Sequence, residues 1–491
     1  MATNGESPIR FRSRRMRPRR GIALVLVLFV IFIEAVLGFA AVSLATLDSQ
    51  SVVQEQLASR ALGLARGGLA RACKELKSNP NWVGTSAYAG NSNGWITIAG
   101  TDNGKQKVTV VVDTNSTWFV TSTGRYLGAQ RTLESYVEFE SFARYAYFTD
   151  SELSTSGGTI WFMDRDAITG AAHTNGYFSI SDHPQFSSRT TSANGSDSYY
   201  NSSAFSYSQG SSTYTTPSKF YRYFNGYSLD YPMAYNDSES FLFAGGQPTV
   251  TMPSDLSTIS TGASKPGTGQ QGYVVTGNAE IRLGYNSSSN TGYAVIMQSG
   301  KSNVTVSLTS DTTIYVKAKT TSGGAPSGTS SGKATIKAAS GSTALVKGRL
   351  TIGANGGMDI YNSIKYKQNS SGEYTGLLGL VSPGAIIVKA DKNTVANFEI
   401  DAAIMSTNNS FTVENYNSGV ARGTLTVRGG IIQKYRGPVG TFSSQSGNIM
   451  TGYAKNYVYD SRLLTTPPPS FPNTGKIVLR SFKDKGALGS D

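Results

Sequence analysis

Residues 22–45 read IALVLVLFVIFIEAVLGFAAVSLA, and Glu34 is the only charged residue among them. As a helix rising about 1.5 Å per residue, this stretch is long enough to cross the roughly 30 Å hydrocarbon core of a membrane. The alternative is a cleaved secretory signal, whose apolar region would run for about 7 to 15 residues and end in a small-residue cleavage site. Since residues 22–45 run on without a break, we predict a membrane-spanning helix.

The segment before this stretch is strongly basic. Residues 1–20 contain seven Arg and a single acid, Glu6, for a net charge of +6. Positive charge beside a membrane-spanning helix tends to stay on the cytoplasmic side. We therefore expect the basic end to remain cytoplasmic and everything after Leu47 to be exported.

The helix is predicted to continue beyond the membrane. From Asp48 to Ser78, apolar residues recur mostly every three to five positions, which is typical of one face of an amphipathic helix. Asn79-Pro80 then ends it. One helix over residues 22–78 is expected, with the apolar face made by Val53, Leu57, Ala61, Leu64, Leu69, Ala72 and Leu76.

A basic leader ending in Arg20-Gly21, followed by a hydrophobic segment that becomes amphipathic, resembles the class III N-terminus of type IV pilins and pseudopilins, and the PilX-type minor pilins in particular. The resemblance implies that a prepilin peptidase cuts between Gly21 and Ile22. It implies anchoring in the inner membrane through residues 22–45, then assembly with other major and minor pilins into an extracellular pilus. An ordinary signal anchor with a juxtamembrane helix is the alternative.

The N-terminus departs from the family at one position. Most members have Glu as the fifth mature residue, where it neutralises the N-terminal ammonium of a neighbouring subunit in an apolar bundle. Leu26 stands there in this sequence. A subunit without that Glu is more easily placed at the end of a filament, so the resemblance implies a position at or near the pilus tip.

Residues 79–142 have the pattern of an antiparallel sheet. Alternating runs occupy 95–98, 107–112, 118–122 and 132–140, and turn sequences such as Asp102-Asn103-Gly104 separate them. This stretch is similar to the sheet of PilX-like minor pilins, in which the exported half of the helix covers one sheet face. The leader, helix and sheet therefore predict an assembly subunit.

From 143 to 440 no helical period survives, and short strand-like runs are joined by Gly, Ser and Asn turns. This pattern is typical of a parallel β-solenoid (β-helix), with a β-sandwich as the alternative. We predict a mainly β protein with a long N-terminal helix, and a C-terminal tail at 441–491. Phrases including 143–152 and 429–442 resemble large competence pilins that carry a β-solenoid, which implies a role in natural transformation or twitching.

The net charge of +13 is concentrated in two places. After removal of the leader, the remaining +7 equals the net charge of residues 301–367, which hold nine basic and two acidic residues. Strand alternation points several of these outward as a stripe that would bind DNA without reading its sequence. The alternative is that they keep exposed strands soluble. The proposed stripe consists of Lys317, Lys319, Lys333, Lys337, Lys347 and Arg349.

A second candidate surface is the aromatic tract at 198–235, a Tyr-rich loop with twelve aromatic residues in 38 positions. Tyr221, Tyr223 and Tyr227 lie in its densest part, where aromatic faces can stack on bases or sugar rings. The alternative is that these rings pack the loop against the solenoid.

The composition argues against an enzyme. A single cysteine, Cys73, allows no intrachain disulfide and no Cys-based zinc site, and there are only two histidines. The acids and histidines of one region, listed here, show no metal-binding spacing: Asp164, Asp166, His173, Asp182 and His183. We expect no cofactor, no metal and no catalysis. The alternatives to DNA binding are a tip pseudopilin or adhesin, or a polysaccharide-acting β-helix.

Overall fold

The protein is mainly β, with one long N-terminal helix and several sheets. It forms two compact units, of which the first holds residues up to 113, 118–137 and those from 479, and the second holds 114–117 and 138–478. The structure is a computed structural model. It describes residues 20–486 apart from 89–90, 92, 115–116, 163–165, 177, 181–184, 194–198, 202–205, 210–211, 216–242, 245, 320–330 and 444–447.

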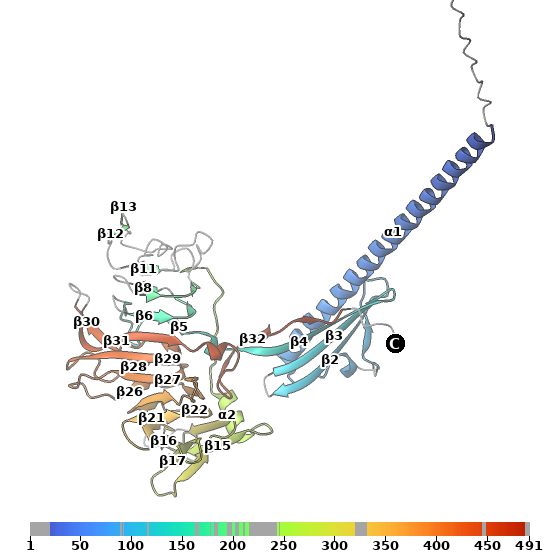
Figure 1. Cartoon of the computed structure of the whole chain (residues 1–491). Helices are drawn as coiled ribbons and strands as arrows, with labels where there is room; N and C mark the ends of the chain where they lie inside the picture. Colours follow the sequence, from blue (N-terminus) through green and yellow to red (C-terminus); the bar gives the residue numbers. More distant parts are fainter. Residues whose placement is uncertain are drawn as a thin grey trace, which may run out of the picture. The chain divides into compact units, whose positions relative to one another are not determined.

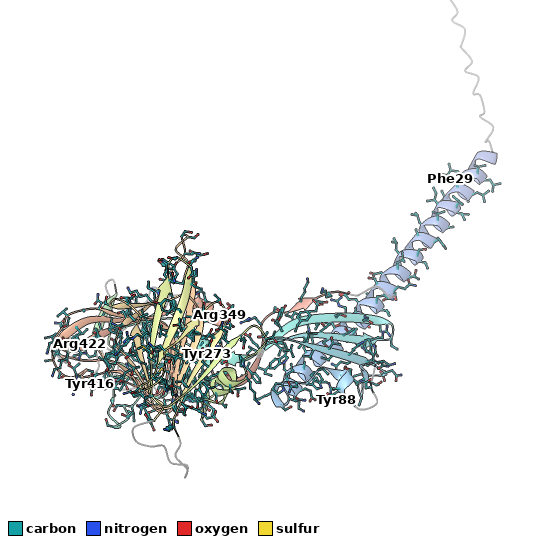
Figure 2. All side chains as sticks on the ribbon, turned by 90° about the horizontal axis from the view of Figure 1, so that it is seen from below. Phe29, Tyr88, Tyr273, Arg349, Tyr416 and Arg422 are labelled. Atoms are coloured by element: carbon teal, nitrogen blue, oxygen red, sulfur yellow. The ribbon has the colours of Figure 1, made fainter. Side chains whose placement is uncertain are left out.

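Helix α1 (Arg20–Ser78) confirms the predicted single helix. The large apolar side chains of its first half are exposed, from Leu24 at 63% to Leu47 at 62%. Figure 2 shows Phe29 among the side chains that project from this half. In the described part of the chain, α1 contains the one helix long and apolar enough to cross a membrane.

The second half of α1 packs against the sheet of the first unit. Its buried stripe consists of Ala61, Ala65, Gly68, Leu69, Ala72 and Leu76. Val53, which the sequence placed on the same face, is 50% exposed, so packing begins about two turns further along.

The contact between α1 and the sheet is close. Ser122 Oγ donates to the Ala65 carbonyl at 2.8 Å, and Gln106 Nε2 donates to the Leu64 carbonyl at 2.7 Å. A Cβ on Gly124 would lie 2.1 Å from the Ala61 carbonyl oxygen. Only glycine leaves room there for the helix backbone to approach the strand.

Four strands of the first sheet follow one another in chain order, as the sequence predicted. They are β1 (Trp95–Thr97), β2 (Lys105–Thr114), β3 (Thr117–Tyr126) and β4 (Ala129–Ser141), preceded by the short helix η1 (Thr85–Ala87). The end of the chain adds β32 (Asn473–Leu479) and β33 (Lys483–Asp484), both of which pair with β4.

The second unit consists mostly of parallel strands stacked on one another (Figure 1). Their pairing groups them into three rows, and buried apolar side chains of all three rows belong to one cluster. Row A contains β15 (Gln271–Thr276), β19 (Thr312–Lys317), β22 (Gly348–Ala354), β25 (Gly376–Ser382), β27 (Phe398–Ser406), β29 (Ala421–Tyr435), β5 (Tyr147–Ser151), β7 (Ala172–Thr174), β10 (Thr190–Ser192) and β14 (Phe243–Ala244), in that spatial order.

Row B contains β21 (Thr343–Val346), β24 (Ser363–Tyr366), the first halves of β27 and β29, β31 (Ile449–Tyr459), β6 (Ala167–Thr169) and β9 (Gln185–Phe186), with β30 (Gly440–Phe442) antiparallel to β31. Row C contains β18 (Val304–Ser307), β17 (Thr291–Met297), β16 (Ala279–Asn286), β20 (Ala334–Ala338), β23 (Met358–Ile360), β26 (Ile386–Val388) and β28 (Phe411–Val413). Two further pairs are β8 (Phe178–Ile180) with β11 (Tyr199–Asn201), and β12 (Ser206–Gln209) with β13 (Ser212–Thr215).

The outer side of row A is covered by the chain itself. Every residue of β25 is buried, which is typical of a parallel strand covered on both faces. The cover includes η2 (Phe142–Arg144), α2 (Ser257–Ser264) and η5 (Ser461–Leu464), whose apolar side chains pack on row A. Charged residues that face outward therefore lie mostly in rows B and C, with Lys317 and Arg349 as exceptions in row A.

The strand order of the stack differs from the chain order. From β15 to β29 the rows follow the chain order, apart from the antiparallel strands β16 to β18 at the end of row C, and we call this part (271–435) the sequential stack. Strands β5 and β6, from the beginning of the unit, then pair with β29 and β31, from its end. We call this layer the junction. The chain therefore enters the stack between its two ends, as Figure 1 shows.

Candidate functional surfaces

Gly21 and Ile22, the predicted processing residues, lie in the first turn of α1. Leu26, which replaces the usual acid of the family, is 60% exposed on the same apolar half. These residues occupy the end of α1 that makes no contact with the sheet of the first unit.

The six residues of the predicted basic stripe lie in different rows. Lys317 ends β19 in row A, and Lys319 follows it, with both side chains exposed. Lys333 immediately precedes β20 of row C, and Lys337 lies within that strand. Lys347 lies between β21 and β22, and Arg349 is in β22. Strand alternation predicted that these side chains point outward. This holds for Lys337, because its neighbour Ile336 is fully buried.

Three of the six form ion pairs with carboxylates that lie on neighbouring strands or, for Asp311, directly before one. Lys333 lies 2.8 Å from Asp359 Oδ2, and Lys337 lies 2.7 Å from Glu280 Oε2. Arg349 lies 2.8 Å from Asp311 Oδ2. These partners reduce the positive charge that the sequence places at the stripe.

The outer side of row C consequently carries both positively and negatively charged side chains. The register pairs Arg282 of β16 with Lys337 of β20, and continued by one residue it brings Tyr361, Lys389 and Glu414, which directly follow β23, β26 and β28, into the same line. Two residues earlier, Glu280 and Asp359 contribute carboxylates. Row C therefore presents both basic and acidic side chains, with Lys337 Nζ also 5.1 Å from the Tyr361 ring centroid.

Two other basic residues are brought together at the C-terminal ends of β21 and β24 in row B. Val346, the last residue of β21, is in register with Tyr366, the last residue of β24, so the residues that follow, Lys347 and Lys367, are neighbours. Lys347 Nζ donates to Asn290 Oδ1 at 2.6 Å, and Lys367 Nζ lies 5.3 Å from the Tyr285 ring centroid. Among the residues that the structure describes, no carboxylate lies within 4.0 Å of either lysine, or of Lys317 and Lys319.

The other predicted candidates lie partly outside the residues that the structure describes. Tyr221, Tyr223 and Tyr227 lie outside the described residues, as do Asp164, Asp182 and His183. His173 is buried and bonds to Thr191 Oγ1 at 2.8 Å, and burial lowers its pKa. Asp166 is buried at the junction. Within the described part of the chain, no group of three or more His, Cys, Asp or Glu residues is arranged to hold a metal ion.

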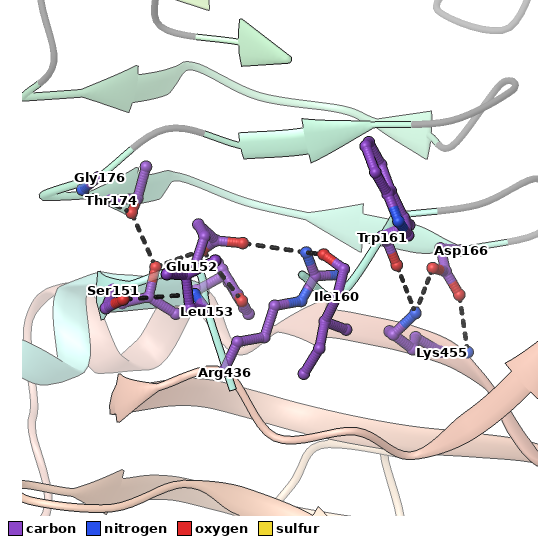
Figure 3. A network of polar contacts seen from close by, with 12 residues as sticks. Ser151, Glu152, Leu153, Ile160, Trp161, Asp166, Thr174, Gly176, Arg436 and Lys455 are labelled. Atoms are coloured by element: carbon purple, nitrogen blue, oxygen red, sulfur yellow. Dashed lines mark hydrogen bonds and ion pairs between the residues drawn. The ribbon is translucent and has the colours of Figure 1, made fainter. Parts of the chain in front are cut away.

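The junction contains four charged groups, of which only Asp166 was among the candidates taken from the sequence (Figure 3). Arg436 Nη1 lies 3.0 Å from Glu152 Oε2, with side-chain exposures of 2% and 3%. Lys455 Nζ contacts Asp166 Oδ2, with exposures of 3% and 0%. Phe162 lies beside both cations, with its ring centroid 3.5 Å from Arg436 Cζ and 5.7 Å from Lys455 Nζ.

Burial affects both pairs. It raises the pKa of Glu152, although Arg436 and the hydroxyls of Thr149 and Tyr147 oppose the change. It lowers the pKa of Lys455, although Asp166 favours the charged amine. Each pair therefore carries a desolvation cost that its partner offsets only in part. Strand alternation could have identified Lys455 in the sequence. It stands two residues from both Tyr453 and Tyr457, on the side of β31 that faces the interior.

Comparison with known proteins gives little further information. A family model described as a domain of unknown function (DUF4900) matches residues 109–195, well under half of the chain. No curated protein matches the sequence. Among solved structures, the crystal structure of the competence-associated pilin ComZ from Thermus thermophilus is similar at 11% identity, covering 88% of this chain and 98% of ComZ, with a TM-score of 0.28. At that TM-score no property of ComZ is transferred to this chain.

Proposed function

We propose that this protein is a minor subunit of a type IV pilus-like filament. In this proposal, residues 1–21 are a leader that a prepilin peptidase removes, and residues 22–45 hold the protein in the inner membrane. After processing, the same apolar half of α1 packs among the helices of other pilins. The protein then stands at or near the filament tip, outside the cell.

The observation that carries the proposal is the division of α1 into two halves. The half from Leu24 to Leu47 exposes its apolar side chains, whereas the half from Ala61 to Leu76 is packed on an antiparallel sheet. An exposed apolar helix of this length requires lipid or other apolar helices around it. Membrane insertion followed by assembly satisfies that requirement in two successive environments.

We further propose that the three rows form a β-solenoid displayed by the filament. The support is the parallel register that links successive strands of rows A, B and C around one apolar interior. Such a body binds through its outer surface, and we expect a binding role without catalysis.

Co-expression of the full chain with a prepilin peptidase tests the proposal. The protein should lose residues 1–21 and begin at Ile22, whereas a Gly21→Val variant should keep its leader because the peptidase cuts after glycine. If wild type and variant both keep the leader, the chain is an ordinary membrane anchor and the proposal is wrong.

A second proposal is sequence-independent DNA binding on the exported surface, in uptake of DNA or in attachment. The favouring observation is the neighbouring pair Lys347 and Lys367, together with exposed Lys317 and Lys319. Lysines without a carboxylate partner are available to displace counterions from phosphates. Lys333, Lys337 and Arg349 remain in the proposed surface with a smaller contribution, because carboxylates already offset their charge.

Salt titration of DNA binding by the full chain in detergent separates the possibilities. A Lys347→Gln/Lys367→Gln variant should bind more weakly at low salt, and its log–log salt slope should fall by about 1.8. The matched control, Lys365→Gln/Glu399→Gln, removes an exposed ion pair outside the proposed surface without changing net charge and should bind as wild type does. Absence of affinity at low salt would contradict DNA binding and favour an adhesin or a polysaccharide-binding body.

A further inference from the structure

Lys455 and Asp166 face each other across the junction. Strand β31 pairs in parallel with β6, with Asn456 opposite Ala167, so the residues immediately before them are also opposite one another. Both side chains are in the stack interior, with 3% and 0% of their surface exposed, and Lys455 Nζ contacts Asp166 Oδ2. The amine and the carboxyl group are thus held together by two strands that cannot slide without breaking their register.

The surroundings of this pair exclude water and supply hydrogen bonds to it. Lys455 Nζ also donates to the Trp161 carbonyl at 3.4 Å, and it lies 5.0 Å from the Phe442 ring centroid. The Lys455 backbone N–H donates to Asp166 Oδ1 at 3.3 Å. In Figure 3 the Trp161 carbonyl and the Asp166 carboxylate meet at the Lys455 amine.

We propose that Lys455 and Asp166 condense into an intramolecular amide bond. The Nζ lone pair attacks Cγ of Asp166, the C–N bond forms, and the bond from Cγ to Oδ2 breaks. Oδ2 leaves as water with two hydrogens that the ammonium group loses, so one ion pair becomes one amide and one water molecule. No oxidant, reductant or further reactant is required.

Three features of the site favour this step. Burial lowers the pKa of Lys455, which increases the fraction of neutral, nucleophilic amine. The backbone N–H on Oδ1 stabilises the negative charge that develops there when Cγ becomes tetrahedral. The product is an uncharged amide, so condensation removes the cost of keeping two buried charges out of water.

The cross-link would fasten the place where the stack departs from chain order. Asp166 and Lys455 are 289 residues apart. A covalent bond between residues so distant removes more conformational freedom from the unfolded chain than one closing a short loop. The second buried pair gives an internal control. An arginine guanidinium is a poor nucleophile, so Glu152 and Arg436 remain an ion pair.

Mass spectrometry of the full chain tests the proposal. The intact protein should weigh about 18 Da less than its sequence requires, the mass of one water molecule. After trypsin, the peptides 166–189 and 437–462 should appear as one linked species, because a modified Lys455 is no longer cleaved. Glu152 and Arg436 should be recovered in unlinked peptides.

A Lys455→Arg variant keeps the positive charge opposite Asp166 but cannot form the amide, so it should have its calculated mass. A wild-type protein at its calculated mass, with free peptides 166–189 and 437–455, overturns the proposal. So does a mass deficit that persists in Lys455→Arg, since it then arises elsewhere. The wild-type measurement needs no variant to fold, and a filament role that fails its own test leaves this result unaffected.

Discussion

The interior of the sequential stack and the interior of the junction differ in chemistry. In row A, the register aligns Ile314, Ile352, Leu380, Ile404 and Ile431 on successive strands, and the next residue in this line is Tyr147 of β5. In row B, the aliphatic line of Ala344, Ile364, Ile400 and Val427 reaches Tyr457 of β31 in the same way. The junction layer adds two buried ion pairs to these aromatic residues.

The difference follows from how each layer finds its partner. In the sequential stack, successive strands are close in the chain, so short turns and hydrophobic alternation set the register. At the junction, segments more than 280 residues apart must pair. Apolar side chains there would tolerate several registers, whereas an ion pair is satisfied in only one. We infer that the buried pairs specify the register of the junction.

Removing one partner of a buried ion pair should have the largest effect. Arg436→Met leaves Glu152 buried without its cation and should lower the free energy of unfolding by about 3–5 kcal/mol. Thermal and urea unfolding of the variant and of Arg436→Met/Glu152→Gln measure this. The double variant should recover most of the loss, since no uncompensated charge remains. Equal losses in both would contradict a role for the pair itself.

Asp401, on β27, is a buried acidic residue in the sequential stack. It therefore tests whether buried charge is confined to the junction. Its side chain is 2% exposed, and burial raises its pKa to about 6. Because the folded-state pKa is higher than the unfolded one, wild type should lose stability as pH rises from about 4 to 6.

Asp401→Asn should therefore be more stable than wild type at pH 7 by about 2–3 kcal/mol, and equally stable near pH 3.5, because about two pKa units correspond to that energy. Asparagine can still accept the Tyr366 N–H, which lies 2.7 Å from the carboxylate. Melting temperatures across this pH range provide the measurement. A difference that does not change with pH would show that the carboxylate charge is not responsible.

Single methyl deletions in the aliphatic interior should have smaller and independent effects. Ile336→Val and Ile404→Val should each cost roughly 1 kcal/mol. The two residues are three strand spacings apart, about 14 Å, so the double variant should show the sum of the two losses. Clear non-additivity would mean that distant layers of the sequential stack are energetically coupled, and it would contradict this expectation.

The smallest effect is expected from an exposed ion pair. Lys365 lies 2.5 Å from Glu399 Oε2 on the outside of the stack, with side-chain exposures of 46% and 25%. Lys365→Ala should change the free energy of unfolding by about 0.2–1 kcal/mol, because water screens the pair. A loss as large as that of Arg436→Met would show that burial does not determine how much an ion pair contributes to stability in this protein.

The parts of the fold set by local pattern could be predicted from the sequence. The apolar run at 22–45 and its amphipathic continuation predicted α1, and alternation predicted the first four strands of the antiparallel sheet. The runs that alternate between 303 and 427 likewise correspond to strands of the stack.

Pairing between distant segments could not be predicted in the same way. Lys337 and Glu280 are 57 positions apart, and only the register of β16 with β20 brings them together. The partners of Lys333 and Arg349 are likewise on other strands, so the sequence overstated the free charge of the stripe. The entry of the chain between the two ends of the stack leaves no local signal, because β5 and β6 pair with strands more than 280 residues away.

The N-terminus of the protein in its native filaments tests the central proposal most directly. Filaments sheared from the cells that make this protein can be digested and analysed by mass spectrometry. The proposal predicts that the protein is present in this fraction and that its chain begins at Ile22. Recovery of the protein with Gly21 still joined to Ile22, or its absence from filaments while it is abundant in the membrane, would contradict the proposal.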